Sequence, residues 1–199
     1  MPRSHAPLTS DRILSSAEDV IRRFGPDKAT VVDVARALGV SHAAVYRHVA
    51  TKAELRDLVV GRWVESTMPP LRKIAAEHGP ALNRLRRFLD ALIKVKRRRA
   101  ANDPELFTAY RALAADAKSI TDAHVGELIE QIAIIIRSGV KDGSFRKVEP
   151  MAAARAVLAA TSRFHHPAHA AEWKDPAVDD AYEDVWKLVT DGLRAAKRK

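Results

Sequence analysis

The sequence contains no cysteine among its 199 residues. A chain without cysteine has no disulfide framework, no thiolate ligand for a metal and no thiol nucleophile. It also lacks an unbroken apolar run of about 18 residues, which a membrane-spanning helix requires. The N-terminal segment MPRSHAPLTS has no apolar core of the kind found in signal peptides. Together these absences predict a cytoplasmic protein whose residues 1–9 form a flexible arm.

The sequence also lacks the local motifs by which common enzyme classes are recognised. None of its eight glycines belongs to a phosphate-binding loop, and it has neither a nucleophile elbow nor the HExxH spacing of zinc proteases. Most histidine and acidic residues are scattered along the chain rather than grouped. We therefore expect no catalytic residues and no cofactor, which makes an enzyme the least favoured class of protein.

One histidine-rich segment, HHPAHAAEW, is an exception to this scatter. His165 and His169 are four residues apart, a spacing at which two histidines of one helix can share a metal ion, and Glu172 follows them. Pro167 interrupts any helix between the two histidines, so the spacing does not guarantee a shared face. We therefore predict no metal site. A helix end or a loop at a subunit contact is the favoured interpretation, and whether His166 or its neighbours bind anything stays open.

Acidic residues are in the minority, and the formal net charge is +9. A positive excess favours an anionic partner. The excess is concentrated between residues 63 and 100, where ten basic residues face three acidic ones. This region ends in the basic run Lys94, Lys96, Arg97, Arg98 and Arg99. The run is either a solvated helix end whose charge complements the helix dipole, or a cluster that strengthens the field of a nearby DNA-binding region.

Apolar residues recur at intervals of three and four along almost the whole chain, which predicts an all-α protein. The pattern is clear over residues 13–24, where Phe24 completes an apolar stripe, and again over 82–100, 120–141 and 178–196. We expect the helix that starts at Lys52 to be broken by the two prolines at 69–70. No segment shows the alternation typical of a strand.

Residues 30–55 carry the most informative pattern in the chain. Thr30 can cap a helix, with Asp33 as its capping-box partner. Gly39 stands where that helix must end, because glycine tolerates the left-handed conformation best. Further capping signals open two more helices, at Ser41 and Thr51. This succession predicts a helix-turn-helix that presents its second helix to a DNA major groove.

The segment around this motif resembles the DNA-binding domain of the TetR family of bacterial transcriptional regulators. The resemblance covers residues 10–58 and rests on Ala29, Thr30, Val34, Ala35, Leu38, Gly39, Val40, Ser41, Val45, Tyr46, His48, Lys52 and Leu55. The rest of the chain resembles the family only in length and helical character. Val49 stands where the family commonly has an aromatic residue, so we expect looser packing beneath the recognition helix.

The resemblance implies an all-α fold with two domains. Residues 10–58 would form a three-helix DNA-binding domain, joined to a larger helical domain at 59–199 that binds an effector and dimerises. It implies a sequence-specific transcriptional regulator, by default a repressor released from its operator by a small molecule. The alternative is a DNA-binding regulator controlled by a protein partner.

The family pattern places the helix that begins at Ser41 in the major groove. Its candidate base readers are His42, which can donate or accept, Ala43, whose methyl group can touch a thymine methyl, and Arg47, which can bind a guanine with two hydrogen bonds. The remaining candidates would contact phosphates and set the register rather than read sequence. They are Thr30, Ser41, Tyr46, His48 and Lys52.

The resemblance also implies an effector pocket inside the C-terminal helices. Large residues expected on inner helix faces are its candidate lining, namely Trp63, Met68, Phe88, Phe107, Tyr110, His124 and Phe164. Such a lining would suit a hydrophobic or aromatic effector. The helices at about 149–165 and 178–196 resemble the pair through which the family forms homodimers on palindromic operators. An exposed apolar stripe would form the interface, namely Tyr182, Val185, Trp186, Val189 and Leu193.

Overall fold

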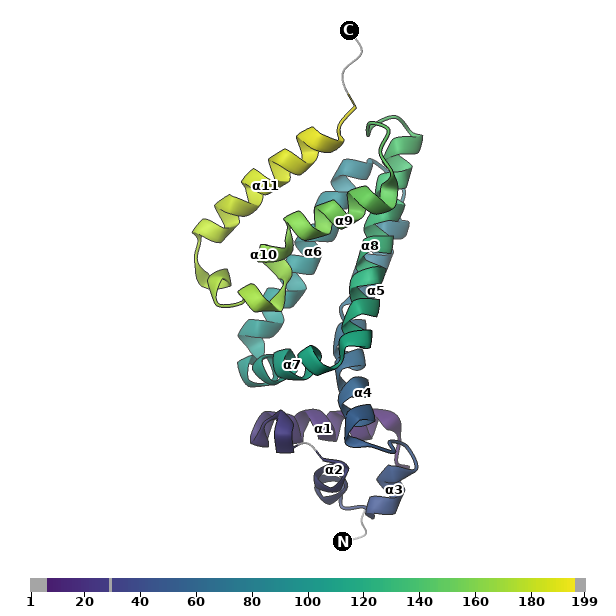
Figure 1. The fold of residues 1–199 in the computed structure, drawn as a ribbon, viewed down its shortest axis with the longest axis vertical. Coiled ribbons are helices and arrows are strands. Elements are labelled where there is room, and N and C mark those ends of the chain that lie inside the picture. Colours follow the sequence, from purple (N-terminus) through teal and green to yellow (C-terminus); the bar gives the residue numbers. More distant parts are fainter. Residues whose placement is uncertain (1–6, 29, 196–199) are drawn as a thin grey trace. The chain divides into compact units, whose positions relative to one another are not determined.

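The computed structural model describes residues 7–28 and 30–195, and the chain is all-α, as the sequence predicts (Figure 1). The β pairing in these ranges is one isolated bridge between Phe145 and Arg194. Most of the arm predicted for residues 1–9 falls on residues 1–6, which lie outside the described ranges. The chain divides into two compact units. Unit 1 comprises residues 1–64 and 103–121, and unit 2 comprises residues 65–102 and 122–199.

Unit 1 contains the helix-turn-helix. Its helices are α1 (Ser10–Phe24), the short 3-10 helix η1 (Pro26–Lys28), α2 (Val31–Leu38), α3 (His42–Tyr46), α4 (Lys52–Glu65, with Glu65 in unit 2) and α7 (Pro104–Asp116). Helix α1 packs against α2 and α7, and α2 packs against α3. The core of this unit is formed by fully buried side chains at helical spacing, among them Ile13, Ala17, Val34, Ala35 and Val45.

The helix boundaries of the motif follow the capping signals in the sequence. The Thr30 hydroxyl oxygen accepts a hydrogen bond from the backbone N–H of Asp33 at 3.2 Å, and Thr51 caps α4 in the same way at 3.0 Å. Gly39 ends α2 at φ 66° and ψ 30°, which is the left-handed conformation. Ser41 then accepts from the backbone N–H of Ala44 at 3.2 Å and opens α3. These predictions are confirmed.

Two predictions about helix faces and ends are wrong. Phe24 was expected to complete the buried stripe of α1, but 64% of its surface is exposed. It is the last residue of the helix, and at Gly25 the chain turns away with φ 81°. The prolines at 69–70 do not end the preceding helix, which stops at Glu65. They lie in the first turn of α5 (Met68–Ala76), where a helix needs no N–H donor.

Helix α7 belongs to the same compact unit as the motif, although α1 ends at Phe24 and α7 begins only at Pro104. Asp103 explains both its start and its attachment. One carboxylate oxygen accepts from the backbone N–H of Leu106 at 3.1 Å, and the other accepts from the Arg22 guanidinium of α1 at 2.8 and 3.0 Å. The compact units therefore differ from the predicted domains 10–58 and 59–199, whose separate functions stay a prediction.

Unit 2 is a helical body around an apolar core. Its helices are α5, α6 (Ala81–Asn102), α8 (Lys118–Lys141, from residue 122 onward), α9 (Pro150–Ala160), α10 (Ser162–His165), the short 3-10 helices η2 (Pro167–His169) and η3 (Glu172–Lys174), and α11 (Ala177–Leu193). Helix α6 packs against α5 and α10. Its stripe Leu85, Leu89 and Leu92 is fully buried, as are Ile132 and Ile136 of α8.

A glycine allows the close approach of two segments in this core. A Cβ atom on Gly139 of α8 would lie 2.5 Å from the Phe145 ring and 2.8 Å from the Cβ atom of Ala81. Both distances are far below ordinary contact, and Ala81 is fully buried. Glycine is therefore the residue that fits this packing arrangement.

Candidate nucleic-acid interface

Helices α2 and α3 and the turn at 39–41 form the candidate reading head. Val45 of α3 and Val49 just beyond it are buried, with 0% and 2% of their surface exposed, and they anchor the recognition segment to unit 1. Helix α3 is short and ends at Tyr46, so Val49 packs from the following turn rather than from the helix. This anchoring fixes which side chains of the segment face outward.

The three candidate base readers are exposed. His42 and Ala43 occupy the first turn of α3, and Arg47 follows its last residue. Ala43 is on the side of α3 away from buried Val45, whereas His42, three residues before Val45, is exposed at the first position of the helix. This arrangement leaves an imidazole, a methyl group and a guanidinium available to base edges. That they read bases stays a prediction.

The candidate phosphate contacts differ in how free their polar groups are. Ser41, Tyr46 and His48 are exposed, and 47% of the Tyr46 surface is accessible. Thr30 is half-buried, and its hydroxyl is already engaged. The hydroxyl donates to the Asp33 carboxylate at 2.5 Å, and its oxygen accepts the hydrogen bond that caps α2. The Thr30 side chain therefore already has a structural role.

Lys52 has a structural contact that sequence reasoning missed. Its ammonium donates to the backbone carbonyl of Asp27 at 2.9 Å and thereby ties the start of α4 to η1. An ammonium has three N–H groups, so two donors remain for a phosphate. No local signal could have revealed this bond, because Asp27 lies 25 residues earlier in the chain.

The candidate effector residues are all buried, and they fall in both compact units. In unit 1, Trp63 of α4 stacks on Tyr110 of α7 with ring centroids 3.4 Å apart, and Phe107 lies 5.8 Å from Trp63. The others belong to unit 2, namely Met68, Phe88, His124 and Phe164. Met68, Phe88 and Phe164 are part of its main apolar core. A ligand contact by any of the seven stays a prediction.

One interpretation of the basic run of α6 was a solvated helix end. The run is not uniformly solvated. Lys96 is 5% exposed, so that interpretation is wrong for this residue. Arg97 forms an ion pair with Asp179 of α11 at 2.6 Å, and Arg99 donates to the hydroxyl of Ser66. Lys94 and Arg98 are exposed. The position of Lys96 follows from its spacing, because it continues the buried stripe of α6 by one more turn.

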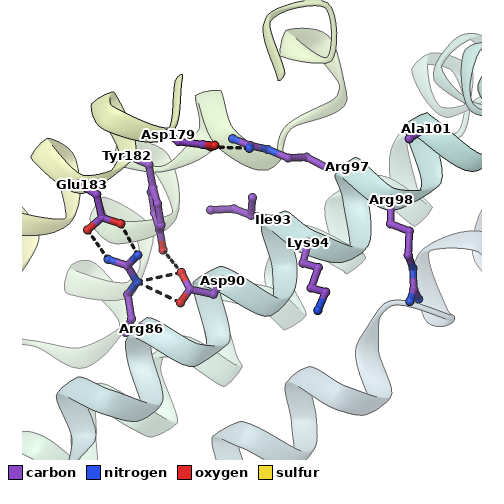
Figure 2. A pocket seen from close by; sticks show the side chains of 10 residues that line it. All are labelled: Arg86, Asp90, Ile93, Lys94, Arg97, Arg98, Ala101, Asp179, Tyr182 and Glu183. Atoms are coloured by element: carbon purple, nitrogen blue, oxygen red, sulfur yellow. Dashed lines mark hydrogen bonds and ion pairs between the residues drawn. The ribbon is translucent and has the colours of Figure 1, made fainter. Parts of the chain in front are cut away.

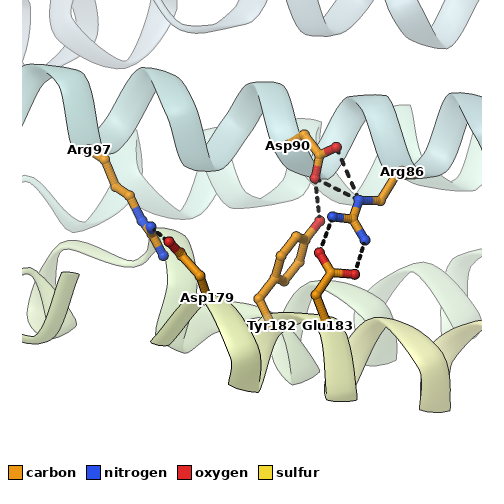
Figure 3. A network of polar contacts seen from close by, with 6 residues as sticks. All are labelled: Arg86, Asp90, Arg97, Asp179, Tyr182 and Glu183. Carbon is orange, nitrogen blue, oxygen red and sulfur yellow. Dashed lines mark hydrogen bonds and ion pairs between the residues drawn. The ribbon is translucent and has the colours of Figure 1, made fainter. Parts of the chain in front are cut away.

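A polar network joins α6 to α11 along an open groove (Figure 2). Arg86 donates to Asp90 at 2.9 Å and to the Glu183 carboxylate at 2.8 Å, and its guanidinium lies 4.7 Å from the centre of the Tyr182 ring. The Tyr182 hydroxyl donates to Asp90 at 2.8 Å (Figure 3). Burial, followed by the Asp90 contact, raises the pKa of Tyr182. The groove wall is thus held by paired charges.

The predicted dimer stripe of α11 is not exposed as a whole. Tyr182 and Leu193 are each only 6% exposed, because the core of their own chain covers them. The rest of the stripe is half-buried and packs against that core, namely Val185, Trp186 and Val189. The prediction of a fully exposed stripe is therefore wrong. Leu188, at 73% exposed, is the prominent apolar side chain on the outer face of this helix.

The histidine-rich segment is divided among different environments. His165 is buried, and its Nε2 atom lies 3.4 Å from the Thr161 hydroxyl. His169 contacts Glu172 at 2.9 Å through Nδ1, and Nδ1 of His166 accepts from the backbone N–H of Ala168 at 3.2 Å. Within residues 7–28 and 30–195, no group of three or more histidine and acidic side chains is arranged to hold a metal ion.

No helix of the described residues is both long enough and apolar enough to cross a bilayer.

The fold and the reading head together define the class of the protein, because an all-α chain with an exposed helix-turn-helix is typical of DNA-binding regulators.

Comparison with known proteins identifies the family. Residues 13–59 match the family described as bacterial regulatory proteins, tetR family, and residues 81–186 match the tetracyclin repressor-like C-terminal domain. The chain therefore belongs to the TetR family and is a DNA-binding transcriptional regulator. This confirms the resemblance to the TetR family that the sequence of the helix-turn-helix indicates.

Individual relatives are more distant. The nucleoid occlusion factor SlmA of Vibrio cholerae is 27% identical over 146 residues, which cover 72% of each chain. Among solved structures, SmeT, the repressor of the Stenotrophomonas maltophilia multidrug efflux pump SmeDEF, has a TM-score of 0.68 at 17% identity, covering 96% of this chain and 92% of that one. A SmeT–triclosan complex has a TM-score of 0.67 at 16% identity, covering 94% and 92%. At these identities, the two structures indicate a shared fold.

Proposed function

We propose that this protein is a repressor that binds a palindromic operator as a homodimer and leaves it when a small effector binds. The observation that carries the proposal is the helix-turn-helix, whose buried Val45 fixes α3 while His42, Ala43 and Arg47 stay exposed. Repression and effector release are the common mode of the family to which the chain belongs. The candidate effector residues of unit 2, Met68, Phe88 and Phe164, are apolar, which would suit an effector with apolar parts.

The proposed division of roles on DNA can be tested with two variants. Arg47→Ala should cost about 1–3 kcal/mol of binding and relax specificity at one base pair. Lys52→Gln removes the charge but retains a donor for the Asp27 carbonyl, so it should weaken binding to all sequences alike and lower the salt slope by about 1. Lys73→Gln, an exposed lysine on α5, is the matched control and should change neither.

The homodimer is proposed to form through the outer faces of α9 and α11. Leu188 is the exposed apolar side chain on the outer face of α11, so it would lie within such an interface. Two-fold symmetry would place the recognition helices about one DNA turn apart, roughly 34–36 Å. Leu188→Glu should shift the protein toward monomer in analytical ultracentrifugation, whereas Leu188→Met should remain dimeric. A dimer that tolerates the glutamate would have a different interface.

Control by a small molecule requires only a modest coupling between the effector site and DNA. A coupling of about 1–3 kcal/mol lowers operator affinity between roughly five- and 150-fold. The SmeT–triclosan structure supports a small-molecule site in this fold, because a protein of the same fold forms a complex with a small molecule. The alternative is control by a protein partner.

In vitro transcription from the promoters that flank the protein's own gene tests the proposal. Wild-type protein should reduce the transcript from one of these promoters, and Arg47→Ala should not. A compound that binds the protein should restore the transcript. Stimulated transcription would overturn the repressor assignment, whereas repression that no compound in a broad metabolite library relieves would favour control by a protein partner.

A further inference from the structure

The open groove between α6 and α11 lies within unit 2 and is lined by ten residues (Figure 2). Its volume is about 640 Å³, which falls in the range of small-molecule binding sites. None of the seven candidate effector residues lines it, and neither does any of the candidate DNA contacts. The groove is therefore a surface feature that the proposed function does not use.

The inner surface of the groove is mostly apolar and is held in place. Ile93 of α6 and Tyr182 of α11 line it, and they are 8% and 6% exposed. The Tyr182 hydroxyl donates to Asp90 at 2.8 Å, and the Tyr182 ring lies against the Arg86 guanidinium. An apolar ligand body would therefore meet a surface that is already ordered, which lowers the entropic cost of binding.

The three acidic side chains of the groove are all engaged by arginines of α6 (Figure 3). Asp179 pairs with Arg97 at 2.6 Å. Asp90 and Glu183 both accept hydrogen bonds from Arg86, at 2.9 and 2.8 Å. The Arg97 Nε atom is buried without an acceptor among the described residues. The basic side of the groove therefore has more donors than the chain supplies acceptors for.

Lys94 and Arg98 are the two cations of the groove that these carboxylates do not pair. Both are exposed, and neither forms an ion pair or a side-chain hydrogen bond within residues 7–28 and 30–195. The other basic side chains of α6 all have such partners, namely Arg84, Arg86, Arg87, Lys96, Arg97 and Arg99.

Lys94 and Arg98 are also placed to act together. They are four residues apart on one helix, a spacing that puts two side chains on the same face with Cβ atoms about 5–6 Å apart. Figure 2 shows both side chains extending from the same side of α6. A single anionic group can therefore contact the ammonium and the guanidinium at once.

The charge of the groove indicates how many negative charges a ligand would carry. Four basic and three acidic side chains line it, so its formal charge is +1. A ligand with one negative charge balances this excess, whereas a second negative charge would face carboxylates and no further free cation. The apolar inner surface favours an organic body over an inorganic ion.

We propose that this groove binds amphiphilic organic anions. The apolar body of the ligand packs against Ile93 and Tyr182, and its one anionic group lies between Lys94 and Arg98. The guanidinium can donate two parallel hydrogen bonds to a carboxylate or sulfonate, and the ammonium adds a point charge. This ligand site is on the surface of unit 2 and is additional to the proposed effector site among buried residues.

Fluorescence titration of the full-length protein with two dyes tests the proposal. The anionic probe is 8-anilinonaphthalene-1-sulfonate, and the neutral probe is N-phenyl-1-naphthylamine, which has the same ring system without the sulfonate. The double variant Lys94→Gln/Arg98→Gln removes both free charges from the groove. It should raise the dissociation constant of the sulfonate at least about tenfold, because charge-assisted hydrogen bonds are lost. The dissociation constant of the neutral probe should stay within about twofold.

A second double variant is the matched control. Lys73→Gln/Arg137→Gln removes the same charge from exposed positions on α5 and α8 that do not line the groove. It should leave the dissociation constants of both probes within about twofold of the wild-type values. Circular dichroism of each variant establishes that it has folded before the titrations are interpreted.

Three results would each overturn the anion site. The first is a sulfonate affinity that is absent in the wild type or unchanged by Lys94→Gln/Arg98→Gln. The second is an equal loss in the control variant, which would show a general effect of net charge. The third is an equal loss for the neutral probe, which would show that the groove itself had been disturbed.

Operator binding, measured by fluorescence anisotropy on the same preparations, separates this inference from the proposed function. If the wild-type protein binds its operator but the dye results fail, only the anion site is refuted. If Lys94→Gln/Arg98→Gln weakens operator binding and leaves the sulfonate affinity unchanged, the two cations serve DNA instead, and the anion site is refuted as well.

Discussion

Replacing Lys96 with methionine is expected to stabilise the protein at neutral pH, although it removes a hydrogen bond. Burial lowers the pKa of this lysine from 10.5 to about 8, which corresponds to about 3 kcal/mol of penalty on its charged form. The variant leaves the His124 Nε2 atom without its donor, at a cost of about 1 kcal/mol. These two contributions give a net gain in the free energy of unfolding of at most about 2 kcal/mol at pH 7, since Lys96 has other contacts besides His124.

The gain should depend on pH with a definite sign. Between pH 8 and pH 10.5 the unfolded state holds more protons on this lysine than the folded state, so the wild-type protein becomes more stable as pH rises. The advantage of Lys96→Met is therefore complete below about pH 8 and should shrink by about 2 kcal/mol between pH 7 and pH 9.5.

Urea unfolding followed by circular dichroism measures both quantities. Protein concentration must be equal in all samples, because dimerisation would contribute to the apparent stability. Lys94→Met, on the exposed side of α6, should change the free energy of unfolding by less than about 0.5 kcal/mol at either pH. The reasoning is refuted if Lys96→Met destabilises the protein at pH 7, or if its effect is the same at both pH values.

Two further predictions concern packing and capping. In thermal unfolding, Gly139→Ala should destabilise the protein by about 1–3 kcal/mol, because the added Cβ atom clashes with the Phe145 ring. Gly126→Ala on the same helix, where a Cβ atom meets nothing within 4 Å, should instead stabilise the protein by about 0.5–1 kcal/mol. Shifts of the same sign for the two variants would contradict the packing described for α8. Asp103→Ala should cost about 1–2 kcal/mol at pH 7, because α7 loses its cap and its link to Arg22. The Arg22 contact lowers the pKa of Asp103, so the stabilisation by Asp103 is present at neutral pH and should diminish below about pH 4. If the free energy of unfolding that Asp103→Ala costs does not change with pH, the ion pair with Arg22 is contradicted.

The parts of the fold that the sequence predicts are those governed by local chemistry. Thr30, Gly39 and Ser41 mark their helix boundaries through caps and a left-handed turn that involve residues only a few positions away. The exposed face of α3 follows equally from the position of Val45 in a short helix. The helix boundaries of the reading head could therefore be predicted, whereas the DNA contacts of its residues stay a prediction.

Features that depend on distant residues were beyond such reasoning. The bond from Lys52 to the Asp27 carbonyl depends on where η1 lies, and the attachment of α7 to unit 1 depends on Asp103 meeting Arg22. Lys96 is an intermediate case. Its spacing from Leu92 places it on the buried stripe, but its basic neighbours favoured the interpretation of a solvated helix end.

The central claim is that α3 reads a DNA sequence. Fluorescence anisotropy with labelled DNA from the regions flanking the gene, at two salt concentrations, tests it most directly, with the double variant Tyr46→Ala/Lys52→Ala as control. The account predicts nanomolar, salt-dependent binding of the wild-type protein to a palindromic site, and loss of that binding in the double variant. Equally weak binding of both proteins to every DNA would contradict it.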